Sequence, residues 1–214
     1  MEVWHAWTAQ RLARRILSDW DRAESTFIVG ICGPPGAGKS TLAAELCSEL
    51  DSIAGAGVAQ LCPMDGFHLS NRRLAELGLA RFKGRIDTFD VEAYVALLER
   101  LGRGERELSC PIYSREVHEV VAEGIWIPAE TRCVVTEGNY LLCSTGRWGA
   151  IGGLLDLKVY LSASLATIRP RLEERHRTGG MSAAEAAEKV AETDLPNARL
   201  IASTERHADL ILRA

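Results

Sequence analysis

Apolar residues in this sequence gather in short uninterrupted runs, which alternate with longer stretches where they recur every three or four positions. The runs, which predict buried strands, are residues 26–32, 58–62, 132–136, 155–161 and 208–212. Runs without polar alternation are typical of parallel strands covered on both faces. The stretches with helical spacing are residues 8–23, 42–50, 88–100, 164–177 and 182–194. The alternation predicts an α/β fold with one parallel, doubly wound sheet and helices on both faces.

The first predicted helix, residues 8–23, has an apolar stripe of Leu12, Ile16 and Trp20 at a spacing of four residues. Arginines lie elsewhere around the helix, which leaves three surfaces open for the apolar stripe to contact: a membrane, a protein partner or the domain itself. Acidic residues among the arginines favour packing against the domain itself.

Two stretches depart from the regular alternation. Residues 69–87 are rich in Arg, Asn and Gly, which predicts either a mobile cover with a basic lining for an anionic ligand or an ordinary solvated surface. Residues 108–127 hold short alternating apolar pieces, which predict a small antiparallel hairpin attached to the main sheet. After the last helix, Pro196 and Asn197 predict a bend.

A glycine-rich segment lies between the first predicted strand and the helix at residues 42–50. It matches the whole pattern G-x-x-x-x-G-K-[ST], and its residues are Gly33, Pro34, Pro35, Gly36, Ala37, Gly38, Lys39, Ser40 and Thr41. Glycines let several backbone N–H groups face one phosphate, and the following helix adds its positive N-terminal dipole. Lys39 would contact the β- and γ-phosphates, and the Ser40 hydroxyl would complete the shell of a Mg²⁺ ion. We therefore predict a P-loop (Walker A motif) that binds a nucleoside triphosphate, rather than a turn without a ligand.

Acidic residues follow the second and third predicted strands, at the edge of the sheet where ligands of such folds bind. Asp65 is the candidate for a general base that anchors an acceptor hydroxyl, and an Asx-type turn with Gly66 is the alternative. Glu137 is the candidate ligand of Mg²⁺ or of its water, and a turn before Gly138 is the alternative.

The predicted helix at residues 164–177 carries two arginines, Arg171 and Arg175, that share a face. Arginines that close over a nucleotide neutralise charge on the γ-phosphate, although exposed helix arginines also occur without this role. The Gly179–Gly180 pair that follows would permit such a closure. The polar candidates for substrate contact in the hairpin region are Tyr113, Arg115 and His118.

Composition narrows the range of partners. The length of 214 residues suits one domain. The net charge of −4 disfavours sequence-independent binding to nucleic acid. The six cysteines contain no C-x-x-C pair, so neither a disulfide framework nor a zinc site is predicted. With no apolar run of membrane-spanning length and no signal-peptide features at the N-terminus, we predict a cytoplasmic protein that acts on a small molecule.

Five motifs, in this order, resemble the P-loop kinases of the phosphoribulokinase, uridine kinase and bacterial pantothenate kinase superfamily. They are GPPGAGKST, MDGFH, RFKGRIDTFD, CPIYSREVHE and VVTEGNYLL. The likeness covers residues 26–212 and is greatest to bacterial nucleoside or fructose-transport-system kinases. It implies a P-loop NTPase three-layer sandwich with a five-stranded parallel sheet of order 2-3-1-4-5. One domain over residues 1–214 would then contain an N-terminal helix in 1–25, a substrate-side insertion at 66–127 and a lid at 164–180.

The resemblance also implies ATP and Mg²⁺ as cofactors, and phosphoryl transfer to a hydroxyl of a sugar, a nucleoside or a pantothenate-like molecule. With the motifs added, the catalytic residues are Asp65, Lys39, Arg171 and Arg175, and the metal ligands are Ser40 and Glu137. The substrate contacts are Asp65, His68, Arg85, Asp87, Tyr113, His118 and Asn139, and Asn197 borders the adenine. Dimers among the relatives leave a homodimer open.

A regulatory P-loop NTPase that uses water as the acceptor is the alternative function. Guanine-specific switch proteins carry an N-K-x-D motif, which this sequence lacks. A switch also has no need of Asp65 at an acceptor site or of a basic cover. The sequence therefore favours a kinase, and its acidic balance disfavours an ATPase that processes nucleic acid.

Overall fold

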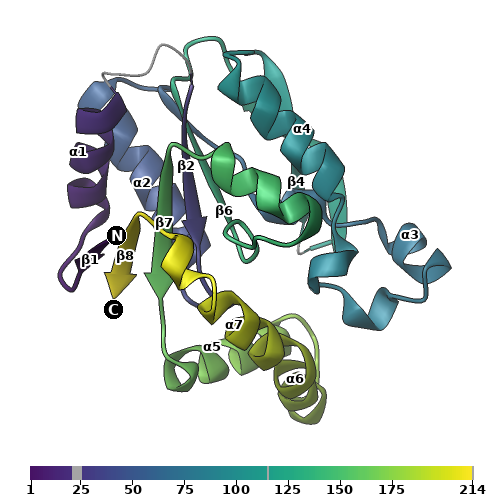
Figure 1. The fold of residues 1–214 in the computed structure, drawn as a ribbon. Coiled ribbons are helices and arrows are strands. Elements are labelled where there is room, and N and C mark those ends of the chain that lie inside the picture. The colour runs from purple at the N-terminus through teal and green to yellow at the C-terminus, as the bar shows by residue number, and fades with distance from the viewer. Residues whose placement is uncertain (21–25, 115, 214) are drawn as a thin grey trace.

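The central sheet of the molecule is parallel throughout (Figure 1). The computed structural model describes residues 1–20, 26–114 and 116–213. In these residues the sheet has six strands in the order β1-β8-β7-β2-β6-β3. The strands are β1 (Glu2–Trp4), β2 (Phe27–Cys32), β3 (Ala59–Leu61), β6 (Cys133–Gly138), β7 (Leu157–Ser162) and β8 (Leu210–Arg213). All five predicted strands are present, and their order, with β2 taken as the first, is the expected 2-3-1-4-5.

The sixth strand, β1, has no counterpart among the predicted strands. It pairs in parallel with β8, with Glu2 opposite Leu210 and Trp4 opposite Leu212. Three residues are too few to show an apolar run or an alternation, so the sequence carries no local signal for this strand. The sheet is therefore one strand wider than predicted, at its β8 edge.

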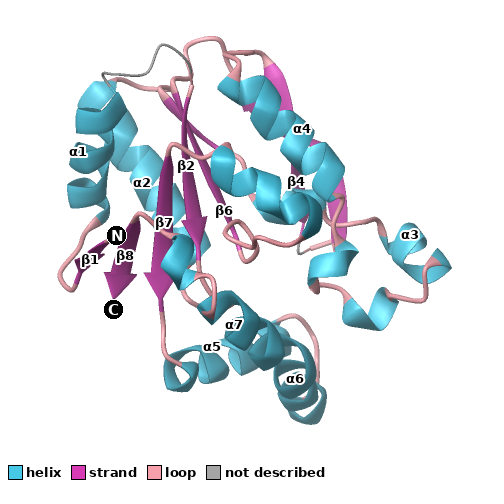
Figure 2. Ribbon diagram, in the orientation of Figure 1, coloured by secondary structure: helices cyan, strands magenta, loops and turns pink. Residues whose placement is uncertain are grey.

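Helices cover both faces of the sheet, as predicted (Figure 2). The helices are α1 (Ala9–Trp20), α2 (Lys39–Ala54), α3 (Asn71–Glu76), α4 (Val91–Gly102), α5 (Leu165–Thr178), α6 (Ala183–Lys189) and α7 (Leu195–Ala202). Helices α1 and α2 pack on one face, and α4 packs on the other with the 3₁₀ segment Gly146–Gly153. Strand β2 is buried along its length because Val29 and Ile31 enter one core and Ile28 enters the other. The predicted three-layer sandwich is confirmed.

Helix α1 packs within the molecule. Its apolar stripe of Leu12, Ile16 and Trp20 is buried, and these residues belong to the same core as α2. The end of the predicted helix, residues 21–23, lies outside the described residues. Among the described helices, none has the length and apolar character needed to cross a bilayer.

The predicted hairpin forms a sheet of its own. Strands β4 (Leu108–Ser114) and β5 (Glu119–Ile127) pair with each other in an antiparallel, two-stranded sheet. In the described residues the hairpin shares no ladder with the main sheet, but it packs on the same core, to which Leu108 and Ile127 contribute. It also packs against the 3₁₀ segment Met64–Phe67. A Cβ atom on Gly66 would lie 1.9 Å from the carbonyl oxygen of Pro111. Only glycine allows the two backbones to approach this closely.

We expect Gly66→Ala to lower the free energy of unfolding by about 1–3 kcal/mol, because the added methyl group would push the hairpin away from Met64–Phe67. Urea denaturation followed by circular dichroism measures this change. Gly152→Ala is the matched control, because a Cβ atom there meets nothing within 4 Å. Equal stability of the Gly66 and Gly152 variants would contradict this account of the hairpin.

The segment after α5 differs from the prediction at its C-terminal end. The last predicted helix, residues 182–194, ends as α6 at Lys189 and continues as a π-helical turn, Val190–Asp194, into α7. Pro196 lies in the first turn of α7, and the π-helical turn before it, in which Leu195 N–H donates to the Val190 carbonyl, leads the helix into this position. The predicted bend at Pro196 and Asn197 is therefore wrong, and helices α5, α6 and α7 gather near the carboxyl ends of the strands (Figure 1).

Candidate functional site

The P-loop joins β2 to α2 and forms one wall of a pocket of about 1110 Å³. Gly36 and Gly38 have φ angles of 78° and 100°, a left-handed conformation that glycine adopts without strain. Helix α2 begins at Lys39, so the backbone N–H groups of its first turn have no helical carbonyl partner. These groups and the helix dipole suit a phosphate group.

Lys39 and Ser40 are held by residues from the end of the neighbouring strand β6. Lys39 is 8% exposed, and its Nζ atom donates to the carbonyl of Pro34 at 3.1 Å and to Asn139 Oδ1 at 2.7 Å. The Ser40 hydroxyl donates to Glu137 Oε1 at 2.8 Å. A hydroxyl beside a carboxylate is an oxygen donor set that suits Mg²⁺, so these residues fit the predicted metal. Asn139, predicted as a substrate contact, lies against Lys39.

Burial lowers the pKa of Lys39, because the charged ammonium group loses hydration. The negative charge of Glu137 opposes this shift most strongly, and that of Asp65 opposes it too, whereas the positive charge of Arg175 adds to it. The predicted catalytic groups therefore act on each other electrostatically in one site.

Asp65 lines the same pocket from the 3₁₀ segment Met64–Phe67, which follows β3. The Nδ1–H group of His68 donates to the carbonyl of Asp65 at 2.8 Å. The His68 ring lies 4.0 Å from the ring of Phe89 and 5.0 Å from that of Tyr113, measured between centroids. Burial lowers the pKa of His68, so the imidazole is neutral at pH 7. Asp65, His68 and Tyr113 thus line the same pocket as the P-loop residues.

His118 of the hairpin turn and Lys83 of the arginine-rich stretch also line the pocket. Lys83 lies 4.7 Å from the centroid of the Tyr113 ring and donates from Nζ to the carbonyl of His118 at 3.0 Å. His118 has a φ angle of 51° and lines the pocket. Arg115, the third polar candidate of the hairpin, lies outside the described residues.

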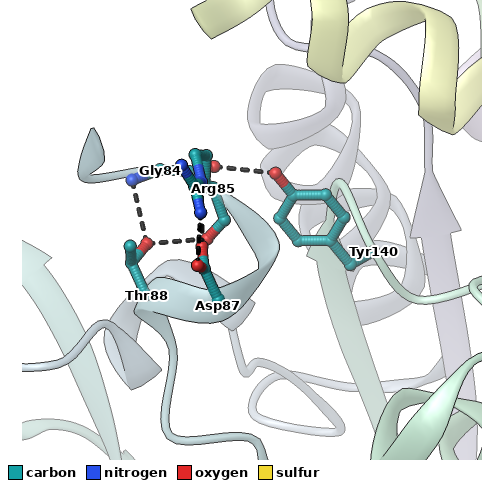
Figure 3. A network of polar contacts seen from close by, with 5 residues as sticks. All are labelled: Gly84, Arg85, Asp87, Thr88 and Tyr140. Atoms are coloured by element: carbon teal, nitrogen blue, oxygen red, sulfur yellow. Dashed lines mark hydrogen bonds and ion pairs between the residues drawn. The ribbon is translucent and has the colours of Figure 1, made fainter. Parts of the chain in front are cut away.

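Arg85 and Asp87 do not line the main pocket in the described structure. Arg85 donates from Nε to Asp87 Oδ1 at 3.0 Å, and a second ion-pair contact joins the same two side chains (Figure 3). Both line a separate hollow of about 360 Å³ on the other side of Asn197. Their role as substrate contacts stays a prediction, and in this structure the two charges pair with each other outside the main pocket.

Two arginines of α5, Arg171 and Arg175, lie near the P-loop. Arg171 donates from Nη1 to the carbonyl of Gly36 at 3.3 Å, and Arg175 lines the pocket on the same face of α5. Helix α5 also packs closely on the loop, since a Cβ atom on Gly36 would lie 3.1 Å from Leu172 Cγ. Asn197 is buried in α7 and also lines the pocket.

Several pocket residues are not among the predicted site residues, and three of them are titratable groups of α5, α6 and the π-helical turn. These three are Lys189, His176 and Asp194. The Nε2 atom of His176 lies 2.7 Å from Asp194 Oδ2, and both side chains are largely buried. Their partners are distant in the sequence and join only when the lid helices pack together, so no local motif marks them.

Comparison with known proteins gives one family. The family model described as "Phosphoribulokinase / Uridine kinase family" matches residues 28–213. A protein from Schizosaccharomyces pombe named "Putative uridine kinase C227.14" is 30% identical, over 89% of this chain and 84% of its own length. A pantothenate kinase from Leifsonia xyli is 30% identical over 78% of this chain, which spans 54% of that enzyme.

A solved structure supports the same relation. The chain is similar to a crystal structure titled "putative fructose transport system kinase" from Silicibacter sp. TM1040, with a TM-score of 0.88 and 32% identity. The similarity covers 96% of this chain and 99% of the other. The fold and the arrangement of the strands are therefore shared over nearly the whole length of both chains.

Proposed function

Because the chain belongs to the phosphoribulokinase/uridine kinase family and is thereby an ATP-dependent small-molecule kinase, we propose that it moves the γ-phosphoryl group of ATP to a hydroxyl group of its acceptor. One observation carries this proposal. Lys39, Ser40 and Glu137 line a single pocket together with Asp65, His68 and Tyr113, which we take as its acceptor side. A phosphate group and an alcohol can therefore meet between them.

The P-loop side binds and orients the triphosphate. The N–H groups at the start of α2 donate to the phosphate oxygens, and the Lys39 ammonium neutralises charge on the β- and γ-phosphates. Ser40 and Glu137 would hold Mg²⁺, which supplies further neutralisation of the phosphate charge when bound. A bound phosphate places negative charge beside the buried Lys39, where Asn139 provides only a neutral amide oxygen. Phosphate binding therefore favours the charged ammonium form of Lys39.

The acceptor side orients the alcohol. The Asp65 carboxylate accepts a hydrogen bond from the acceptor hydroxyl and takes its proton as the oxygen attacks phosphorus. Arg171 and Arg175 donate toward the transferred phosphoryl group and stabilise the charge that develops on it. His68 and Tyr113 present ring faces and polar atoms to the body of the acceptor, which suits a sugar, a nucleoside or a pantothenate-like molecule.

Release of ADP measured with and without a panel of sugars, nucleosides and pantothenate tests the proposal. We expect turnover of Mg²⁺–ATP to depend on one class of acceptor, with stoichiometric formation of the phosphorylated product. Turnover that is equally fast without any acceptor would instead support the alternative, a regulatory NTPase that uses water.

A further inference from the structure

Residues 81–84, which we call the bridging segment, are held by the lid helices through their backbone carbonyl groups. Lys189, at the end of α6, donates from Nζ to the carbonyl oxygens of Arg81 at 3.4 Å and Lys83 at 3.2 Å. Asn197 in α7 donates from Nδ2 to the carbonyl oxygen of Gly84 at 3.2 Å. Lys189 and Asn197 therefore bind a segment that is more than a hundred residues away in the sequence.

The same segment is joined to the acceptor side of the pocket. The Nζ atom of Lys83 donates to Asn71 Oδ1 at 2.6 Å and to the carbonyl of His118, so it ties the start of α3 to the hairpin turn. Tyr140, which follows β6, donates from its hydroxyl to the carbonyl of Gly84 at 2.7 Å (Figure 3). A displacement of the bridging segment would therefore move the hairpin turn and the wall formed by α3.

The lid is connected in turn to the P-loop. Arg171 of α5 contacts the carbonyl of Gly36, and His176 of the same helix pairs with Asp194 in the π-helical turn between α6 and α7. Lys189 ends the helix that enters this turn. Polar contacts and the helix backbone together thus link the P-loop, through α5 and the π-helical turn, to Lys189 and the bridging segment.

We infer that Lys189 is a positioning residue that couples nucleotide binding at the P-loop to ordering of the acceptor side of the pocket. This inference rests on the proposed function. A nucleotide that engages the P-loop and the lid arginines favours the packed arrangement of α5, and Lys189 passes this preference to the bridging segment. Because such coupling is reciprocal, a bound acceptor also favours the lid arrangement that holds ATP.

The environment of Lys189 supports a specific role. Burial lowers the pKa of its ammonium group, which the charge of Asp194 partly opposes, so the side chain loses hydration where it lies. The carbonyl oxygens of Arg81 and Lys83 replace part of that hydration. A lysine that served only solubility would remain in water, as the side chains on the outer face of α6 do.

Hydrogen exchange with and without the ATP analogue AMP-PNP and Mg²⁺ tests the inference without knowledge of the acceptor. The reporters are the amide groups of Gly84 and Arg85, which donate to Thr88 Oγ1 and to the carbonyl of Phe82. In the wild-type protein we expect AMP-PNP to slow exchange at the P-loop and to slow it by about tenfold in the bridging segment. In Lys189→Met we expect the P-loop effect to remain and the effect on the bridging segment to be lost.

Two further variants complete the test. Lys189→Arg keeps the charge and the donors, so it should recover part of the protection of the bridging segment. Glu188→Gln, an exposed change one residue earlier, should behave as the wild type does. Full protection of the bridging segment in Lys189→Met, or none in the wild type despite P-loop protection, would overturn the inference. Absence of P-loop protection in the wild type would instead overturn nucleotide binding and thus the proposed function.

Discussion

Asp65→Asn is expected to lower kcat by about 10²–10⁴-fold while the affinity for ATP changes little. The amide keeps the size and polarity of the carboxylate but does not accept the proton of the acceptor hydroxyl. In the proposed arrangement Asp65 contacts the acceptor, whereas Lys39 and Ser40 hold the phosphates in the same pocket. Steady-state kinetics with the acceptor found in the panel measure kcat, and titration calorimetry with AMP-PNP measures nucleotide affinity.

Glu137→Gln is the matched comparison for this variant. Because Glu137 contacts the Ser40 hydroxyl, its amide variant should require more Mg²⁺ for half-maximal activity. Asp65→Asn should not change this requirement. If Asp65→Asn instead abolished nucleotide binding or raised the Mg²⁺ requirement, Asp65 would be the metal ligand and the two acids would have exchanged roles.

Lys39→Met is expected to lower kcat/KM for ATP by about 10²–10³-fold, because the variant loses the cation beside the β- and γ-phosphates. The loss should not arise from unfolding. A pKa lowered by burial means that folding disfavours the charged form of Lys39, so an apolar side chain of similar length should leave Tm equal or higher. Kinetics at saturating acceptor and a thermal melt measure the two effects.

Lys158→Met is the matched control for the change at Lys39. Lys158 lies on β7, where it pairs with Asp209 rather than lining the pocket. Its variant should keep the wild-type kcat/KM. Equal losses in both lysine variants would show that a general effect of charge, and not the position of Lys39 in the P-loop, controls the reaction.

The core of the fold could be predicted from the sequence because its signals are local. Strand β2 and the strands beside it are uninterrupted apolar runs, and a sheet covered on both faces requires them. The strand β1 and the independence of the hairpin carry no such signal. Three residues of β1 pair with β8 at the other end of the chain, and the hairpin is placed by tertiary contacts such as the close approach between Gly66 and Pro111.

The residues of the candidate site likewise include some with a local sequence signal and some without one. The P-loop was predictable because its conformation depends on glycines at fixed spacing, and Asp65 and Glu137 because they follow strands whose ends must meet. The ion pair of Arg85 and Asp87, which keeps both side chains outside the main pocket, was not predictable, because nothing in the local sequence marks it. Lys189 had no signal, because its acceptors are backbone carbonyls, which every residue carries.

The separate two-stranded sheet has a consequence for how this architecture acquires new specificities. In the described residues β4 and β5 exchange no ladder hydrogen bonds with the central sheet, so insertions or altered side chains there leave the register of the main strands untouched. The phosphate-handling half of the molecule can thus stay constant while the hairpin diverges. Grafting a relative's hairpin behind Gly66 should transfer acceptor preference and leave nucleotide preference with the host.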